Sequence, residues 1–135
     1  MKLKYRTLAR QYAVQALYCW EISKNNINEI EKYFFFDKKN KIDVIYFRNL
    51  IIGVSNYHII IDNVIKNYLS RPISRLNPIE KTILRLSFYE LIKIKTIPYK
   101  VIINEAIELA KIFGAIDSHK FINAVLDNAA KKINV

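Results

Sequence analysis

Glycine and proline are scarce in this chain, and no other feature constrains its fold as much. Only two glycines and three prolines occur in 135 residues. An all-β domain needs turn signals about every 8–12 residues, and these two residue types supply many of them. Apolar residues instead recur three or four positions apart, which is the spacing of one face of an α-helix. The sequence therefore predicts an all-α fold of about seven helices in two small helical bundles, covering about residues 1–71 and about residues 76–135.

Short polar side chains mark where these helices begin. Asn77 is predicted to cap one helix, because Pro78 follows at its first position and Glu80 at its third. Such a side-chain oxygen accepts a hydrogen bond from an N–H group that the first helical turn leaves unpaired. The other predicted N-caps are Asn26, Asp43 and Asp117.

The two glycines indicate where helices end or break. Gly114 follows an apolar helical segment, and we expect it to end that helix in the left-handed conformation. Gly53 and Ser55 interrupt the apolar pattern of residues 42–69. That segment therefore forms either one bent helix or two.

The chain is strongly basic. It has 22 Lys and Arg residues against 12 Asp and Glu residues, a formal net charge of +10. Such a charge favours polyanions, because binding them releases condensed counterions. Lysine is accompanied by abundant isoleucine and asparagine, however, and codon bias toward A and T can produce all three. Net charge alone leaves both explanations open.

The distribution of charge at the N-terminus is more informative. Lys2, Lys4, Arg6 and Arg10 all precede the first acidic residue, Glu21. The dipole of a helix disfavours positive charge at its start. Phosphate groups are the obvious ligands for such a cluster, since arginine binds them through two hydrogen bonds at once. The alternative is an exposed end that serves solubility only.

Tyr18 is predicted to lie on the polar face of the first helix, beside Gln11 and Gln15. An aromatic side chain on a polar face often marks a contact surface, because it supplies area at little cost in entropy. The alternative is a ring that lies flat on its own helix.

The sequence contains no arrangement that favours catalysis. Ser118 and His119 are adjacent, and neighbouring side chains on a helix point about 100° apart. Glu105 and Glu108 share a helix face, but no histidine accompanies them as in a helical metal site. We expect no enzyme activity, no catalytic or metal-binding residues and no cofactor.

A single cysteine excludes an intrachain disulfide framework and suits a reducing compartment. No uninterrupted apolar run approaches the roughly 20 residues of a membrane helix, and the first residues lack the apolar stretch of a signal peptide. We therefore expect a cytoplasmic protein that does not bind membranes.

Segments along almost the whole chain share their residues with one protein family, most densely from Pro98 to Asp127. These segments are Ala9-Arg10, Ala13-Val14-Gln15-Ala16-Leu17-Tyr18, Trp20, Tyr46-Phe47-Arg48, Tyr68-Leu69-Ser70-Arg71, Glu80-Lys81, Leu84-Arg85, Tyr89-Glu90-Leu91, Pro98-Tyr99-Lys100-Val101, Asn104-Glu105-Ala106-Ile107-Glu108-Leu109-Ala110-Lys111, Phe113-Gly114, Asp117-Ser118-His119-Lys120-Phe121, Asn123 and Val125-Leu126-Asp127. In them the chain resembles the NusB family of transcription antitermination factors.

This resemblance implies a protein that binds the boxA element of nascent ribosomal RNA transcripts together with NusE, a small-subunit ribosomal protein. With other Nus factors, the complex helps the RNA polymerase elongation complex to read through terminators. The positions that match RNA-contacting residues of the family are Lys2, Arg6, Arg10, Lys120 and Phe121. The positions that match its NusE interface are Tyr18, Glu80 and Asp117.

The sequence departs from the family pattern at Thr7 and Leu8, where further arginines often occur. Three of the matched residues also have purely structural interpretations. Phe121 is placed to form a hydrophobic staple with Ile116, and the two acids Glu80 and Asp117 can serve as helix-capping residues.

Two other functions are compatible with the sequence. The same helical module resembles the N-terminal RNA-binding region of certain ribosomal-RNA cytosine methyltransferases, which predicts an accessory module without a cofactor site of its own. The other alternative is an interaction protein that does not bind RNA. A homodimer in the free state is left open.

Overall fold

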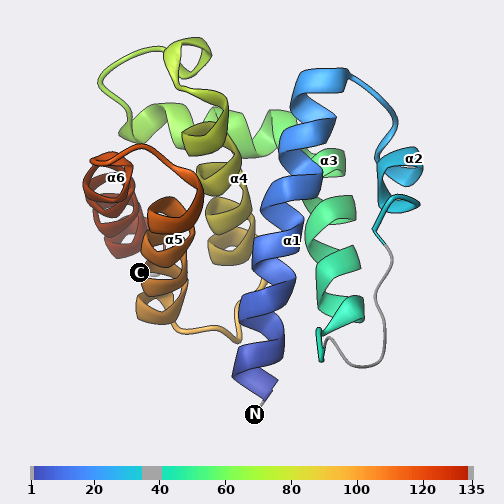
Figure 1. Cartoon of the computed structure of the whole chain (residues 1–135). Helices are drawn as coiled ribbons and strands as arrows, with labels where there is room; N and C mark the ends of the chain where they lie inside the picture. The colour runs from blue at the N-terminus through green and yellow to red at the C-terminus, as the bar shows by residue number, and fades with distance from the viewer. Residues whose placement is uncertain (1, 35–40, 134–135) are drawn as a thin grey trace. The chain divides into compact units, whose positions relative to one another are not determined.

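The computed structural model describes residues 2–34 and 41–133, and within them it contains six α-helices and no β-strand (Figure 1). The helices are α1 (Lys2–Ser23), α2 (Ile27–Glu31), α3 (Val44–Ile65), α4 (Pro78–Lys93), α5 (Tyr99–Phe113) and α6 (Ser118–Ile133). Two short 3₁₀ helices, η2 (Lys66–Tyr68) and η3 (Ile73–Arg75), lie between α3 and α4. The predicted all-α fold is confirmed.

The predicted count of about seven helices is too high by one, because residues 42–69 do not form two α-helices. Gly53 and Ser55 both lie inside α3, which runs unbroken from Val44 to Ile65. The Ser55 hydroxyl donates a hydrogen bond to the Ile52 carbonyl, at 3.1 Å, so this polar group is satisfied within the helix itself.

Three of the predicted N-caps are confirmed. The side-chain oxygens of Asn26, Asp43 and Asn77 each accept a hydrogen bond from a backbone N–H two or three residues further on, at 2.8, 2.9 and 2.8 Å respectively. Pro78 is the first residue of α4, as predicted. Each of these caps is a contact between residues within one helical turn, which is why the sequence locates them correctly.

The predicted conformation of Gly114 is wrong. Its φ of −92° and ψ of 179° are extended rather than left-handed. The glycine is needed here for a different reason, since a Cβ atom at this position would lie 2.7 Å from the Ala110 carbonyl oxygen and 2.8 Å from the Ser118 Cβ. The close approach between the end of α5 and the start of α6 therefore excludes a side chain.

The chain divides into two compact units, Met1–Asn56 and Tyr57–Val135. In the first unit α1 lies beside α2, and the Asp43 N–H donates to the Tyr5 carbonyl, at 3.2 Å, which ties the start of α3 to α1. In the second unit α4, α5 and α6 pack against one another (Figure 1).

Buried apolar side chains come from all six α-helices. In the first unit they are Ala9, Ala13, Val14, Ala16, Leu17, Ile27, Ile30, Tyr46, Phe47, Leu50, Ile51 and Val54. In the second unit they are Ile61, Ile65, Leu76, Ile83, Leu84, Leu86, Phe88, Tyr89, Leu91, Ile102, Ile103, Ala106, Leu109, Ala110, Ile122, Val125, Leu126, Ala129 and Ala130. Every residue of α4 from Thr82 to Leu91 is buried, so this helix is covered around its whole circumference.

One helical segment of the described chain, Val44–Tyr68, is long and apolar enough to cross a membrane by length and composition. Its side chains at Phe47, Leu50, Ile61 and Ile65 are fully buried within the protein. A core helix of a globular protein has the same properties, so a single segment of this kind is weak support for a membrane span.

Candidate nucleic-acid interface

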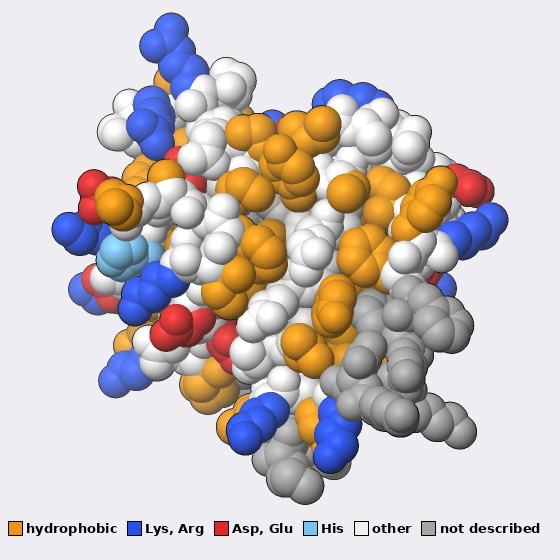
Figure 2. Space-filling model, viewed as in Figure 1, with side chains coloured by type: hydrophobic (Ala, Val, Ile, Leu, Met, Phe, Trp, Pro, Cys, Tyr) orange, Lys and Arg blue, Asp and Glu red, His pale blue; other side chains and the backbone are white. Residues whose placement is uncertain are grey.

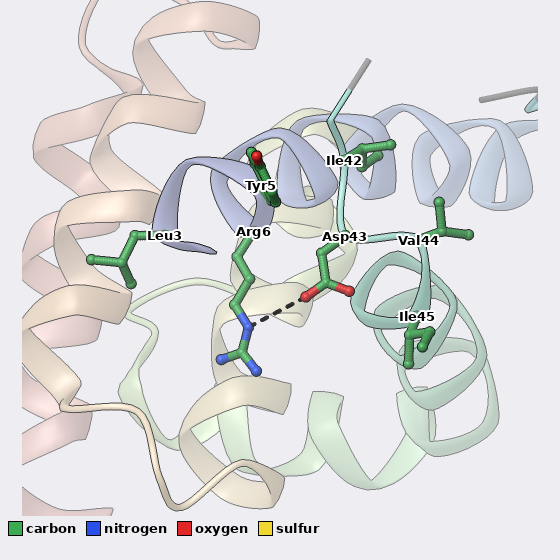
Figure 3. A pocket seen from close by; sticks show the side chains of 7 residues that line it. All are labelled: Leu3, Tyr5, Arg6, Ile42, Asp43, Val44 and Ile45. Atoms are coloured by element: carbon green, nitrogen blue, oxygen red, sulfur yellow. Dashed lines mark ion pairs between the residues drawn. The ribbon is translucent and has the colours of Figure 1, made fainter. Parts of the chain in front are cut away.

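Two arginines of α1 lie over one aromatic ring at the start of α3. The guanidinium carbon of Arg6 is 4.3 Å from the centroid of the Tyr46 ring, and that of Arg10 is 5.4 Å from it. The Arg6 Nε also lies 3.8 Å from Asp43 Oδ2, and this ion pair is the dashed line in Figure 3. The two distances from the guanidinium carbons to the ring centroid are in the range of cation–π attraction. We call Arg6, Arg10, Asp43 and Tyr46 the Tyr46 cluster.

The two arginines of the Tyr46 cluster differ in exposure. The Arg6 side chain is 38% exposed, whereas Arg10 is only 3% exposed. Arg6 can therefore meet an anion from solution, while the Arg10 side chain is buried and its role as an RNA contact stays a prediction. Arg10 shares its helix face with buried Ala13 and Leu17, and this spacing is the signal that could have revealed its burial. The side chain of Lys2 lies outside the described residues.

A cavity of about 750 Å³ opens beside the Tyr46 cluster (Figure 3). Its wall is mainly apolar and carries one cation and one acid, the Arg6–Asp43 ion pair. The lining residues are Leu3, Tyr5, Arg6, Ile42, Asp43, Val44 and Ile45. The first turns of α1 and the start of α3 thus form a partly apolar hollow with a charged edge.

A second group of polar and aromatic side chains joins α4, α6 and the segment before η3. The Ser118 hydroxyl donates to Glu80 Oε2, at 2.8 Å, and Arg71 Nη2 lies 3.6 Å from Glu80 Oε1. The guanidinium carbon of Arg71 is 4.8 Å from the centroid of the Phe121 ring. We call Arg71, Glu80, Ser118 and Phe121 the Phe121 cluster. It brings together two of the predicted site residues, Glu80 and Phe121.

The other predicted residues near the start of α6 face solvent. The side chains of Asp117 and Lys120 are both 74% exposed, and Lys120 Nζ lies 3.6 Å from Asp117 Oδ1. The predicted staple between Ile116 and Phe121 is wrong, because Ile116 is almost fully exposed and Phe121 is covered by Arg71 instead. Glu80 differs from Asp117 in being buried, with both carboxylate oxygens engaged.

Tyr18 lies on α1 between two exposed residues, Gln15 and Cys19, and is itself half-buried. Gln11, the other residue predicted beside this ring, is likewise half-buried, and the role of Tyr18 as a partner contact stays a prediction. Figure 2 shows hydrophobic side chains exposed on the viewed face of the molecule and Lys and Arg side chains mostly toward its rim.

Sequence reasoning missed two arginine interactions. The sequence predicts no contact for Arg71 beyond its match to a family segment, because nothing local connects it with Phe121. Arg85 forms two hydrogen bonds with Asp62, from Nε to Oδ1 at 2.8 Å and from Nη2 to Oδ2 at 2.7 Å, and its side chain is 6% exposed. These partners are 23 residues apart in sequence, so helical spacing could not pair them.

The described residues include no group of three or more histidine, cysteine, aspartate or glutamate side chains that could hold a metal ion.

Burial, with added contributions from Tyr57 and Glu90, raises the pKa of the Tyr89 hydroxyl above its ordinary value of 10.0. Tyr89 is therefore neutral at physiological pH. The chemistry that the two clusters offer is recognition of anionic and aromatic groups.

The fold and these clusters define a small protein, all-helical in its described residues, in which three arginines lie over aromatic rings. A profile of the NusB family matches residues 7–131. The transcription antitermination protein NusB of Buchnera aphidicola subsp. Baizongia pistaciae (strain Bp) is 56% identical over 133 residues, which are 98% of this chain and 92% of that protein. The chain belongs to the NusB family.

Solved structures agree with this assignment. T. maritima NusB matches with a TM-score of 0.84 at 36% identity, over 94% of this chain and 91% of that one. A chain from the crystal structure of the antitermination factors NusB and NusE in complex with dsRNA matches with a TM-score of 0.82 at 28% identity, over 96% of this chain and 98% of that one.

Proposed function

We propose that this protein is a transcription antitermination factor that binds RNA together with NusE and acts by binding, without catalysis. The observation that carries this function is the similarity to NusB over nearly the whole chain. The likeness to a chain solved with NusE and RNA supports both partners. The alternative of a methyltransferase accessory module is not favoured, because the match to NusB spans both proteins almost end to end.

The proposal extends to finer points. The RNA is a boxA-type single strand of a nascent ribosomal RNA transcript, and the complex acts on the RNA polymerase elongation complex with other Nus factors in the cytoplasm. The helices form two bundles, which the division into two compact units supports. We place the RNA contacts at Lys2, Arg6, Arg10, Lys120 and Phe121 and the NusE contacts at Tyr18, Glu80 and Asp117.

The exposed members of these two sets suggest how binding occurs. Arg6 and Lys120 present cations to phosphates, and the Phe121 ring offers a surface on which an unpaired base can stack. Tyr18 supplies aromatic contact area for a protein partner. Two weak contacts within one complex give strong net binding, because the second becomes effectively intramolecular.

The proposed function is tested by titrating boxA-type and scrambled single-stranded RNA with the protein, with and without NusE, at two salt concentrations. We expect tighter binding to boxA-type RNA and a larger preference when NusE is present. Equal binding of both RNAs under all conditions would contradict sequence-specific recognition, since the remaining attraction would be electrostatic only.

The partner surface is tested by Tyr18→Asp. We expect at least about a tenfold loss of NusE affinity, because this change places a charge where an aromatic contact is buried on binding. Binding of RNA alone and the midpoint of thermal unfolding should be unchanged, because Tyr18 is partly exposed. A variant that loses RNA binding, NusE binding and stability together would assign Tyr18 to the fold instead.

A further inference from the structure

We propose that Arg71 is an RNA-contacting residue that forms, with the ring of Phe121, a single stacking platform for an unpaired base. This inference rests on the proposed RNA-binding function and adds to it a residue with no assigned role. The platform joins two segments that are distant in sequence, the turn after η2 and the first turn of α6.

The first support is the distance between the Arg71 guanidinium and the Phe121 ring. The Arg71 guanidinium carbon lies 4.8 Å from the Phe121 centroid, within the roughly 6 Å over which a cation is attracted to an aromatic face. The Arg71 side chain nevertheless remains 48% exposed. Guanidinium planes stack on unpaired bases much as aromatic rings do. A base that approaches this site therefore meets a cation already positioned by the ring.

The second support is the loose contact between Arg71 and Glu80. Their nearest atoms, Nη2 and Oε1, are 3.6 Å apart, longer than the roughly 2.7–2.9 Å of a strong charge-assisted hydrogen bond. The Glu80 carboxylate has a closer partner in the Ser118 hydroxyl, at 2.8 Å. Glu80 thus attracts the Arg71 guanidinium but does not occupy all five N–H donors of Arg71. Donors therefore remain for a phosphate.

Arg85 shows what a fully engaged arginine looks like in the same unit. Its two hydrogen bonds to Asp62, at 2.8 and 2.7 Å, and its 6% exposure leave it buried and paired. Arg71 has the opposite properties on each count, since its ion pair is long and its side chain is exposed. Arg85 therefore stabilises the fold, whereas Arg71 is available for a ligand.

RNA suits this surface better than an acidic protein segment does. The site combines an aromatic face with a guanidinium 4.8 Å from its centroid, and the residue before Phe121 on α6, Lys120, is an exposed cation. An unpaired nucleotide offers the matching groups, a flat base beside a phosphate. A carboxylate of a protein partner would satisfy the cations but leave the aromatic face unused.

Arg71→Ala is the primary test, with Arg75→Ala as the matched control. Arg75 is another exposed arginine of the same unit and its removal changes the net charge equally. Affinity for single-stranded boxA-type RNA is measured without NusE at several salt concentrations. We expect Arg71→Ala to weaken binding about tenfold, and Arg75→Ala to have a much smaller effect. The midpoint of thermal unfolding should change little in either variant.

Two further variants separate stacking from charge. Arg71→Lys keeps the charge but loses the planar group. We expect this variant to bind RNA with the salt dependence of the wild type, but to lose most of the affinity that separates the wild type from Arg71→Ala. Phe121→Leu combined with Arg71→Ala should weaken binding less than the product of the two single losses, because both changes remove one platform.

Each outcome decides between defined alternatives. If Arg71→Ala and Arg75→Ala bind RNA with the same affinity, the role of Arg71 is overturned. The proposed function stays intact as long as the wild-type protein binds RNA. Unchanged RNA binding with weakened NusE binding would assign Arg71 to the protein partner instead. Wild-type protein that does not bind RNA would overturn the proposed function and this inference together.

Discussion

The two compact units each contain an arginine stacked on an aromatic ring, but they use the pair differently. In the Tyr46 cluster the ring is buried and lies beneath two arginines, one of which is itself buried. In the Phe121 cluster a half-buried ring carries one arginine that remains about half exposed. The same attraction therefore joins a buried ring to one buried and one partly exposed arginine in the first unit, and a half-buried ring to a single half-exposed arginine in the second.

From this difference we propose that burial, more than residue type, separates structural arginines from binding ones. Arg10 has the chemistry of an RNA ligand, yet its surroundings are those of a core residue. Arg6 and Arg71 have the same side chain and keep part of it accessible. Variants that remove each arginine or ring in turn can break or sharpen this distinction.

The largest expected effect belongs to Arg10→Ala. This change empties a buried site and removes a cation from the Tyr46 ring, so we expect it to lower the free energy of unfolding by about 3 kcal/mol. Urea-induced unfolding measures this loss. The matched variant is Arg6→Ala, which removes a partly exposed cation and should cost less than about 1 kcal/mol.

The opposite result would break the distinction between the clusters. If Arg10→Ala folds as stably as the wild type and loses RNA affinity, then the proposed RNA contact is the main role of Arg10 and its burial contributes little to stability. Burial in the free protein would then be a poor guide to function in α1.

Gly114→Ala is expected to have the next largest effect. A Cβ atom here would overlap the Ala110 carbonyl and the Ser118 side chain, and overpacking of this kind costs about 2 kcal/mol. Because Ser118 holds Glu80, the change disturbs the Phe121 cluster and should also weaken RNA binding. Thermal unfolding and RNA titration measure the two losses. Unchanged stability would mean that the turn between α5 and α6 shifts without cost.

The local features of this fold could be predicted from sequence. Asn26, Asp43 and Asn77 cap their helices as predicted, because a cap depends on residues within one turn. The conformation of Gly114 was not predictable in the same way. Its backbone is extended, and no side chain fits at this position, because α6 approaches the end of α5 closely. This approach is a tertiary contact.

The candidate site could be predicted only in part, for the same reason. The spacing along α1 places Arg6 and Tyr18 at accessible positions, and it could have indicated the burial of Arg10. The pairing of Arg71 with Phe121 joins residues 50 positions apart, and no helical period connects them. The residues that give the Phe121 cluster its chemistry therefore emerge only from the folded structure.

Replacing each ring by leucine tests the two clusters directly. Phe121→Leu should weaken RNA binding about tenfold, because it removes the surface on which a base stacks, and should change stability little. Tyr46→Leu should instead lower the free energy of unfolding by about 1 kcal/mol, because its ring supports two cations, and should weaken RNA binding less than Phe121→Leu does. Fluorescence titration of RNA and urea unfolding of both variants measure the contrast. If the two variants lose the same amount of RNA affinity and the same amount of unfolding free energy, the clusters do not differ in role.

The smallest expected effect is that of Lys120→Ala, for which α6 offers a close control. Lys120 and Lys131 are both exposed lysines of this helix, and each lies near an aspartate, at 3.6 Å from Asp117 and 3.2 Å from Asp127. Only Lys120 is next to Phe121. We expect Lys120→Ala to weaken RNA binding about threefold and to reduce the salt dependence of log Kd by about 0.7, the value for one phosphate contact on a single strand. Lys131→Ala should change neither, because its position is remote in sequence from the Phe121 cluster. Equal losses of RNA affinity in the two variants would show that the lysines of α6 act through net charge alone. RNA binding at the Phe121 cluster would then depend on stacking and on Arg71.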